Sequence, residues 1–406
     1  MELPLGTAPA PRVLERIHRT TRTRIADNAL LDELTRLLRE IVPFDASFWA
    51  AADPLTMLAT SPSRLENLGS GEACDRYWEA EFFVEDVNHF RALARRTSPA
   101  ASLYRATGGH PARSSRYHTL NRPLGLGDEL RCVFRTGGEV WGYACLWRAE
   151  GGRPFSVAEE RVLADLSAPV AEAFRRAALL RPDPVGRVPD VPGLLTFDGA
   201  GVLESYNEAA EEWLRDLPLT RLNGDAPATP GLTLLNGDAP ATPHLTLLNG
   251  GGRDAPPPLL DLPAELRTVL NKARAVAAGR DTGPARARLL VRGRWLTIHG
   301  FPLRGPEAAA PRTALVIEPA KAADIAPLIA RAYRLGRREQ QVTRLVANGL
   351  TTSEIAATLC LSTHTVRGYL KQVFEKVEVS TRGGLVAKIF ADHYKGTLDP
   401  DIHLDG

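Results

Sequence analysis

The first 180 residues combine apolar positions at helical spacing with short runs rich in β-forming residues. Apolar residues three and four positions apart indicate helices, and short β-rich runs bounded by turn residues indicate strands. Helices are therefore expected at 20–41, 72–83 and 86–96, and strands at 46–51, 56–60, 128–136 and 139–149. This mixture predicts an α+β unit at the start of the chain.

Two local signals define how this unit closes. Gly137-Gly138 lies between two β-rich runs, which is typical of a β-hairpin. Ser156 and Glu159 have the spacing of a capping box, so a helix is expected to begin there and to run to about Leu180. The proline-rich residues 181–193 then predict a linker.

A second set of strand and helix signals begins at Leu194. A strand, a turn and a strand precede Asn207, a favourable N-cap for a helix that ends near Leu217. More strands are expected within 287–303 and 312–319, and a helix over 321–334 leads into the last part of the chain. The pattern predicts a second α+β unit.

An exact tandem repeat interrupts this second unit. The sequence LNGDAPATP stands at 222–230 and again at 235–243, a period of 13 residues. Two copies of so short a period are too few for a solenoid, so the segment is interpreted as an expanded loop. Because the entropy of loop closure changes slowly with length, deleting one copy is expected to leave the melting midpoint nearly unchanged.

Four helix signals follow one another closely in residues 335–394. Glu339 stands three residues after Gly336, Thr351 and Glu354 have capping-box spacing, and Gly349 is a helix stop. A tight turn over 360–362 separates two of these helices, the second of which is expected at 363–377. Two short helices joined by such a turn are a helix-turn-helix pattern.

The helix expected at 363–377 has one apolar and one polar face. Burying its valines and Leu370 leaves His364, Arg367, Gly368 and Lys371 on the opposite side. Arginine can bind a guanine edge with two hydrogen bonds, and hydroxyls at a helix N-terminus suit phosphate. The predicted DNA-binding residues are Ser362, Thr363, His364, Thr365, Arg367, Gly368, Lys371 and Lys376.

Charge supports this interpretation. The chain has a net charge of only +2, but residues 331–395 hold eleven basic and five acidic residues. A compact basic module on a nearly neutral body favours a polyanionic partner.

Composition and length describe a multidomain globular chain. At roughly 100–200 residues per domain, 406 residues predict two to four domains. No apolar run reaches the roughly 18–20 residues that cross a membrane, and the four cysteines form no Cys-x-x-Cys pair. A cytoplasmic location without membrane contact is therefore expected.

The C-terminal segment resembles the LuxR-type helix-turn-helix of bacterial transcription regulators. The resemblance is carried by LGRREQQV at 335–342, VANGLTTSEIAATLCLSTHTVRGYLK at 346–371 and KVEVSTR at 376–382. It implies a scaffold helix at 353–359, a recognition helix at 363–377 and a DNA-bound homodimer formed through the last helix, at about 382–394. Gly336, Gly368 and Glu378 depart from the family pattern, which affects base preference.

The preceding units resemble sensor folds. Residues 20–180 are similar to a GAF domain, through RPLGLGDELRCVFRTGGEVWGYACLWR and the closing helix. Residues 190–320 are similar to a PAS domain, with the repeat inserted at about 218–258, and residues 331–396 form the DNA-binding domain. The expected fold class is multidomain α+β, with GAF-like and PAS-like units followed by an all-α, four-helix domain.

Other chemistry is weakly represented. The sequence contains no P-loop and no His-Glu-x-x-His motif, so an enzyme is not expected and no cofactor, catalytic residue or metal ligand is predicted. The alternative is a GAF-type thiol redox enzyme or sensor that uses Cys132 and Cys145, with DNA binding secondary. A third reading makes the front units dimerisation scaffolds. The expected partners are double-stranded DNA and a second copy of the chain, with a small-molecule effector or RNA polymerase as further candidates.

Overall fold

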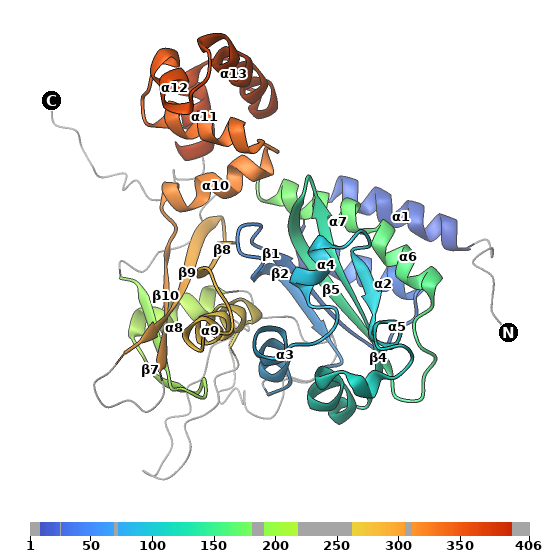
Figure 1. The fold of residues 1–406 in the computed structure, drawn as a ribbon. Coiled ribbons are helices and arrows are strands. Elements are labelled where there is room, and N and C mark those ends of the chain that lie inside the picture. Colours follow the sequence, from blue (N-terminus) through green and yellow to red (C-terminus); the bar gives the residue numbers. More distant parts are fainter. Residues whose placement is uncertain are drawn as a thin grey trace, which may run out of the picture.

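A computed structural model describes residues 9–24, 26–68, 72–180, 191–217, 262–304 and 311–391. Within these residues the chain forms two five-stranded antiparallel sheets, each with its own helices, and a helical C-terminal domain (Figure 1). The multidomain α+β prediction is therefore confirmed. The exact domain limits stay predictions.

The first sheet has the strand order β2-β1-β5-β4-β3. Its strands are β1 (Ala46–Ala52), β2 (Ala59–Glu66), β3 (Ala100–Ser102), β4 (Leu126–Thr136) and β5 (Glu139–Ala149). The predicted hairpin joins β4 to β5. Gly137 and Gly138 both have positive φ, 61° and 83°, as a two-residue turn between twisted strands requires.

Helices cover both faces of this sheet. One core packs the sheet against α1 (Pro9–Thr23), α2 (Asn28–Arg39), α6 (Val157–Asp165) and α7 (Ser167–Ala177). The other core packs it against α3 (Glu72–Phe83) and α4 (Phe90–Arg95). Short helical turns complete this side: α5 (Leu103–Ala106), η1 (Pro111–Arg113), η2 (Tyr117–Asn121) and η3 (Arg122–Leu124).

Two helices expected to be continuous are broken. The helix predicted at 20–41 is wrong, because α1 ends at Thr23 and α2 begins after Asp27, whose carboxylate accepts a hydrogen bond from Leu30 N at 2.8 Å. The helix opened by the Ser156–Glu159 capping box forms as predicted but breaks at Leu166. Pro169 has no N–H with which to bond the carbonyl one turn earlier.

The second sheet has the same topology as the first. Its order is β7-β6-β10-β9-β8, so both sheets place their second, first, fifth, fourth and third strands side by side. The strands are β6 (Gly193–Phe197), β7 (Leu203–Tyr206), β8 (Ala285–Val291), β9 (Arg294–Leu303) and β10 (Arg312–Pro319). Helices α8 (Glu208–Asp216) and α9 (Ala264–Ala277) pack on it. The tandem repeat lies outside the described residues.

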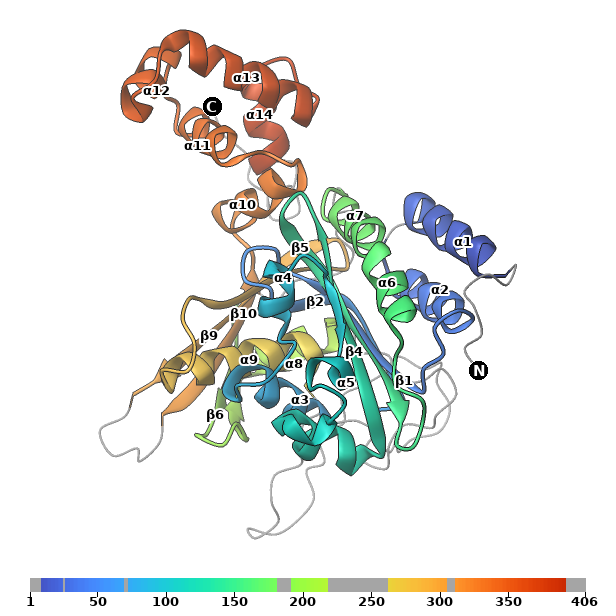
Figure 2. The ribbon, with the colours of Figure 1, turned by 45° about the vertical axis from the view of Figure 1, so that its right-hand side comes forward.

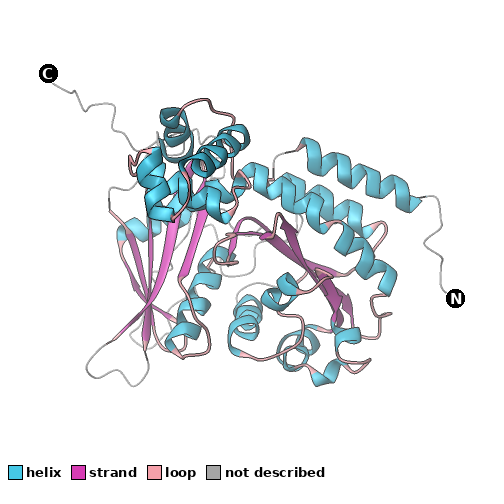
Figure 3. Cartoon of the chain, turned by 45° about the horizontal axis from the view of Figure 1, so that its top comes forward, coloured by secondary structure: helices cyan, strands magenta, loops and turns pink. Residues whose placement is uncertain are grey.

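Helix α9 was not predicted from the sequence. It packs on β8, β9 and β10 of its own sheet and also contacts α3 and β2 of the first unit. Figure 3 shows the two sheets side by side with helices between them. Residues of α9 are therefore buried on both sides: Leu266, Val269, Leu270 and Ala273 enter the core of the second sheet, and the polar Glu265, Arg267 and Lys272 are buried as well.

The C-terminal domain follows α10 (Ala322–Ala332). Its helices are α11 (Arg337–Ala347), α12 (Thr352–Leu359), α13 (Thr363–Val377) and α14 (Arg382–Val386), with a π-helical turn at Ala387–Ala391 (Figure 2). The predicted apolar residues form one core, which includes Val342, Val346, Ile355, Val366, Leu370, Val373 and Val377. The last helix is shorter than expected, and residues 392–394 lie outside the described part.

Candidate nucleic-acid interface

A three-residue turn joins α12 to α13. Cys360 ends α12 in the left-handed region, with φ of 53°, and Leu361 N bonds Ala356 O at 2.9 Å. Ser362 then caps α13, because its hydroxyl accepts a hydrogen bond from Thr365 N at 3.0 Å. The predicted turn and the predicted cap are confirmed.

The other helix starts are also fixed by local hydrogen bonds. Thr351 N donates to the Glu354 carboxylate at 2.7 Å, and Glu354 N donates to the Thr351 hydroxyl at 3.3 Å. The hydrogen bonds from the Thr351 backbone and side chain lower the pKa of Glu354. At the start of α11, Gly336 N donates to Glu339 Oε2 at 2.5 Å. These caps fix the residues at which α11 and α12 begin.

Helix α13 presents one face to the core and one to solvent. Val366, Leu370, Val373 and Val377 are buried. The residues at the N-terminal end of the helix and on its outer face are exposed: Ser362, Thr363, His364, Thr365, Arg367, Gly368 and Lys371. A Cβ built on Gly368 would meet nothing within 4 Å, so the surface there is open.

The structure brings seven of the eight predicted residues together and separates Lys376. The Lys376 ammonium lies 2.6 Å from Glu339 Oε2 and donates to the Arg334 carbonyl at 3.2 Å. It therefore ties the C-terminal end of α13 to the start of α11. The carboxylate that holds it is 37 positions away in the sequence, so spacing within α13 carries no signal of this pair.

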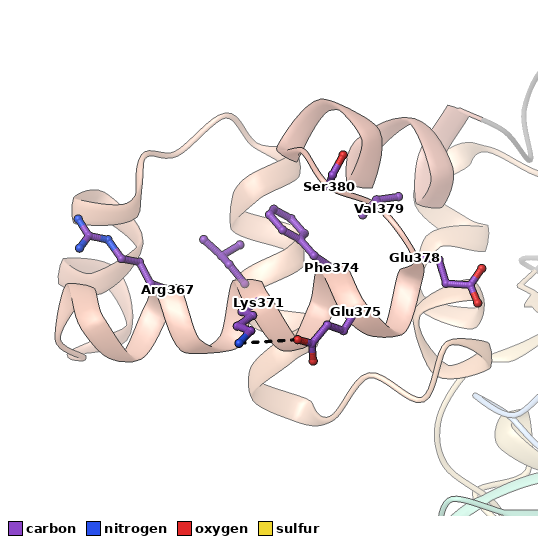
Figure 4. A pocket seen from close by; sticks show the side chains of 8 residues that line it. Arg367, Lys371, Phe374, Glu375, Glu378, Val379 and Ser380 are labelled. Carbon is purple, nitrogen blue, oxygen red and sulfur yellow. Dashed lines mark ion pairs between the residues drawn. The ribbon is translucent and has the colours of Figure 1, made fainter.

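The outer surface of α13 changes charge along its length. A shallow groove runs between the helix and residues 378–380, and its lining residues are Arg367, Leu370, Lys371, Phe374, Glu375, Glu378, Val379 and Ser380. Figure 4 shows Arg367 at one end of α13 and Glu378 at the other, with Lys371 next to Glu375 between them. Lys371 Nζ and Glu375 Oε1 are 4.0 Å apart, with both side chains largely exposed. Sequence reasoning missed this groove and its acidic end.

The thiols of the alternative hypothesis lie apart. Cys132 is paired with Ala144 and Cys145 with Arg131, so the two side chains point to opposite faces of the sheet and enter different cores. Burial raises the pKa of Cys132 and raises that of Cys145 to about 12. Both groups are therefore protonated at neutral pH, whereas thiol chemistry requires a thiolate.

A buried charged cluster fills the space between the first sheet and α3 and α4. Arg131 is fully buried and lies 2.7 Å from Glu129 and 2.6 Å from Glu81. Its guanidinium stacks over the rings of Tyr77 and Phe90. Burial alone would raise the pKa of Glu81, but the charge of Arg131 and the contact with His89 outweigh it and lower the pKa to about 2.

Some buried polar atoms around this cluster lack a hydrogen-bond partner within the described residues. They include Nη1 of Arg116, Nη2 of Arg131, Nδ1 of His89 and the hydroxyl of Tyr143. Buried polar groups in proteins are nearly always paired, with other protein groups or with ordered water. Sequence reasoning missed the cluster, because its members come from separate elements.

Clusters of metal-ligating side chains and membrane-spanning helices are both absent from the described ranges. These residues contain no group of three or more His, Cys, Asp or Glu side chains that could hold a metal ion. None of the helices in these ranges is long and apolar enough to span a membrane.

The capped helices, the tight turn and the exposed polar face of α13 together define a helix-turn-helix module. Residues 334–388 match the family model for bacterial regulatory proteins of the luxR family. These residues are therefore a helix-turn-helix domain of the luxR type, and the resemblance found in the C-terminal segment is confirmed.

Individual relatives cover smaller or more distant parts. The transcriptional regulatory protein DesR of Bacillus subtilis (strain 168) is 44% identical over 55 residues, which are 14% of this chain and 28% of DesR. The chain thus matches less than a third of that relative's length.

Two solved structures show likeness at low identity. A GAF domain of a phosphoenolpyruvate-protein phosphotransferase from Coxiella burnetii is 16% identical, with a TM-score of 0.28, covering 42% of this chain and 96% of that one. The VqmA dimer of Vibrio cholerae, a LuxR-type receptor, is 19% identical, with a TM-score of 0.14, covering 31% of this chain and 60% of that one.

Proposed function

We propose that the chain is a DNA-binding transcriptional regulator that inserts α13 into the major groove of double-stranded DNA. The observation that carries the proposal is the exposed N-terminal half of α13, where Arg367 and Lys371 stand one turn apart beside the open Gly368. In helix-turn-helix proteins this half of the second helix contacts base edges.

Some of these side chains suit contact with DNA bases, and others suit contact with the phosphate backbone. Arg367 can present its planar fork to a guanine edge, and Gly368 adds no side chain that would keep the helix away. The hydroxyls of Thr363 and Thr365 stand at the N-terminus of α13, where free N–H groups attract phosphate. The acidic C-terminal end of the groove repels the backbone and limits contact to the first half of the helix.

The proposal includes a homodimer, because two recognition helices can then read two half-sites about one helical turn apart. RNA polymerase contact and a cytoplasmic location are part of the same proposal. No catalytic step belongs to it.

A small-molecule effector is favoured by one observation in the first unit. Arg116 and Arg131 flank the buried Glu129, and each has a guanidinium nitrogen without a hydrogen-bond partner within the described residues, as has the hydroxyl of Tyr143. We propose that an anionic small molecule satisfies them. Native mass spectrometry and thermal melts of the purified chain test this. A bound small molecule that is lost in Arg131→Met would support the proposal. A chain that carries no bound molecule, and whose melting midpoint does not change when a panel of carboxylates is added, would contradict it.

A mobility shift with the full chain tests DNA binding. Duplexes of random sequence, which report binding to the DNA backbone, are titrated with three proteins. These are the wild type, Arg367→Ala/Lys371→Ala and a control, Arg122→Ala/Arg280→Ala. The control removes two exposed arginines that lie outside the C-terminal domain. The wild type and the control are expected to bind alike and the α13 variant to bind at least tenfold more weakly. Equal binding by all three would contradict the proposal.

A further inference from the structure

Helix α1 carries an exposed basic face that the helix-turn-helix module does not explain. Residues 9–24 contain five arginines and a single acid, Glu15. Arg12, Arg19, Arg22 and Arg24 are exposed, and within the described residues none of them forms an ion pair. The fifth arginine, Arg16, lies 3.9 Å from both Glu33, on α2, and Glu40, which follows that helix.

The opposite face of α1 is held firmly by the body. Val13, Ile17 and Thr21 are buried, and the two apolar residues belong to the core that includes α2 and α7. At 100° per residue, Arg12, Arg19 and Arg22 fall within about 80° of one another, on the side away from this buried row. The arginines therefore project from a fixed platform.

Adjacent residues of α7 tie this platform to the DNA-binding end of the chain. Arg176 donates a hydrogen bond to the carbonyl of Thr21, in the last turn of α1. Its neighbour Arg175 donates to the carbonyl of Ala332, the last residue of α10. Glu172, one turn earlier, lies 2.6 Å from Arg334. Figures 1 and 2 both show α1 alongside α7, with one end of α7 next to α10.

Resting on the proposed function, we infer that the exposed arginines of α1 bind the phosphate backbone of the same duplex, on the flank of the sequence that α13 reads. Arginines without carboxylate partners match a line of phosphates, and their neutralisation releases counterions from DNA. The link through α7 places the basic end of α1 beside the start of the DNA-binding domain. Glu15, which lies within the arginine face, opposes this contact.

The test separates this contact from binding by α13. Affinities of Arg12→Gln/Arg19→Gln/Arg22→Gln and of a matched control, Arg95→Gln/Arg122→Gln/Arg280→Gln, are measured against salt on two duplexes. One duplex contains only the sequence protected by α13, and the other extends it by two helical turns on each side. Both variants are first checked for an unchanged melting midpoint.

On the long duplex, the α1 variant is expected to lose about one to three units of salt slope, and the control none. On the short duplex all three proteins are expected to bind equally. Glu15→Gln is expected to tighten binding to the long duplex alone. Equal slopes for the α1 variant and the wild type on the long duplex would overturn the inference. If the wild type bound neither duplex, the proposed function itself would fail.

Discussion

Two basic side chains on α13 are expected to fail differently when removed. Arg367 stands beside the open Gly368, so Arg367→Ala should weaken binding to the specific site by about 1–3 kcal/mol and relax preference at one base pair. Lys371 is a flexible point charge, 80% exposed, so Lys371→Ala should weaken specific and random DNA alike and lower the salt slope by about one unit.

Affinities of both variants for specific and scrambled duplexes at several salt concentrations check this division. If Arg367→Ala lost affinity equally for the specific and the scrambled duplex, contact with the base edge would be assigned to Lys371 or His364 instead.

Glu81 gives the first unit a defined sensitivity to acid. Its pKa is about 2 in the folded chain against 4.5 for an ordinary glutamate, so its charged form is favoured by folding. The resulting stability is present above about pH 4.5 and is lost as the pH falls toward 2, a difference of up to about 3 kcal/mol. Urea unfolding between pH 7 and 2 should show a weaker pH dependence for Glu81→Gln than for the wild type. Parallel curves would mean that other carboxylates carry the effect.

The side chains that sequence reasoning placed correctly are those whose partners are close in the chain. The caps Ser362 and Thr351 bond backbone groups three residues away, so residue type and spacing suffice to predict them. Lys376 was predicted to contact DNA, but its geometry is decided by a carboxylate on another helix. Spacing along one helix contains no information of that kind.

The pair formed by Lys376 and Glu339 joins two helices of the C-terminal domain. The Glu339 side chain is only 6% exposed and also accepts a hydrogen bond from Gly336 N. Lys376→Met leaves this carboxylate without its charged partner, so it should lower the free energy of unfolding by about 1–3 kcal/mol with little effect on the DNA affinity of the folded chain.

Lys371→Met is the matched comparison, because it should weaken DNA binding and leave the melting midpoint unchanged. Thermal melts and DNA titrations of both variants separate the two roles. If Lys376→Met had normal stability but bound DNA weakly, Lys376 would be a DNA contact and not a structural residue.

Among the helices, the spacing of apolar residues was the signal that the predictions used. The apolar row of α13 repeats at helical spacing because its other face meets water. Helix α9 is buried against both units, and its polar residues are satisfied by ion pairs such as Lys272 with Asp281, at 2.7 Å. Its apolar residues Leu266, Val269, Leu270 and Ala273 do stand at helical spacing, so the sequence carries the signal of this helix and the prediction overlooked it.

One arginine connects three parts of the chain as a whole. Arg288, on β8, lies 2.7 Å from Asp53 of the first unit and donates from Nε to the carbonyl of Asp324 on α10 at 2.6 Å. Both partners of the ion pair are buried. Burial raises the pKa of Asp53 in spite of the opposing charge of Arg288. Arg288 therefore joins the two α+β units to each other and to α10, the helix that leads to the DNA-binding domain.

Removing this arginine should loosen the whole assembly. Arg288→Met leaves the buried Asp53 carboxylate without its charged partner, with only backbone N–H groups bonded to it, which is expected to lower the free energy of unfolding by about 3–5 kcal/mol. Asp53→Asn/Arg288→Met should recover part of that loss, since no charge is left unpaired. Urea unfolding of the three proteins checks both statements, and an Arg288→Met chain as stable as the wild type would contradict the role of the pair. A contact between positions 235 residues apart could not be predicted from a single sequence.

The most direct measurement is selection of bound duplexes from a random library by the full chain, followed by footprinting of the selected sequence. One recurring sequence with two inverted half-sites about one helical turn apart is expected, and Arg367→Ala/Lys371→Ala should fail to select it. No recurring sequence at low salt, or the same sequence selected as strongly by the double variant, would contradict the claim that α13 reads DNA.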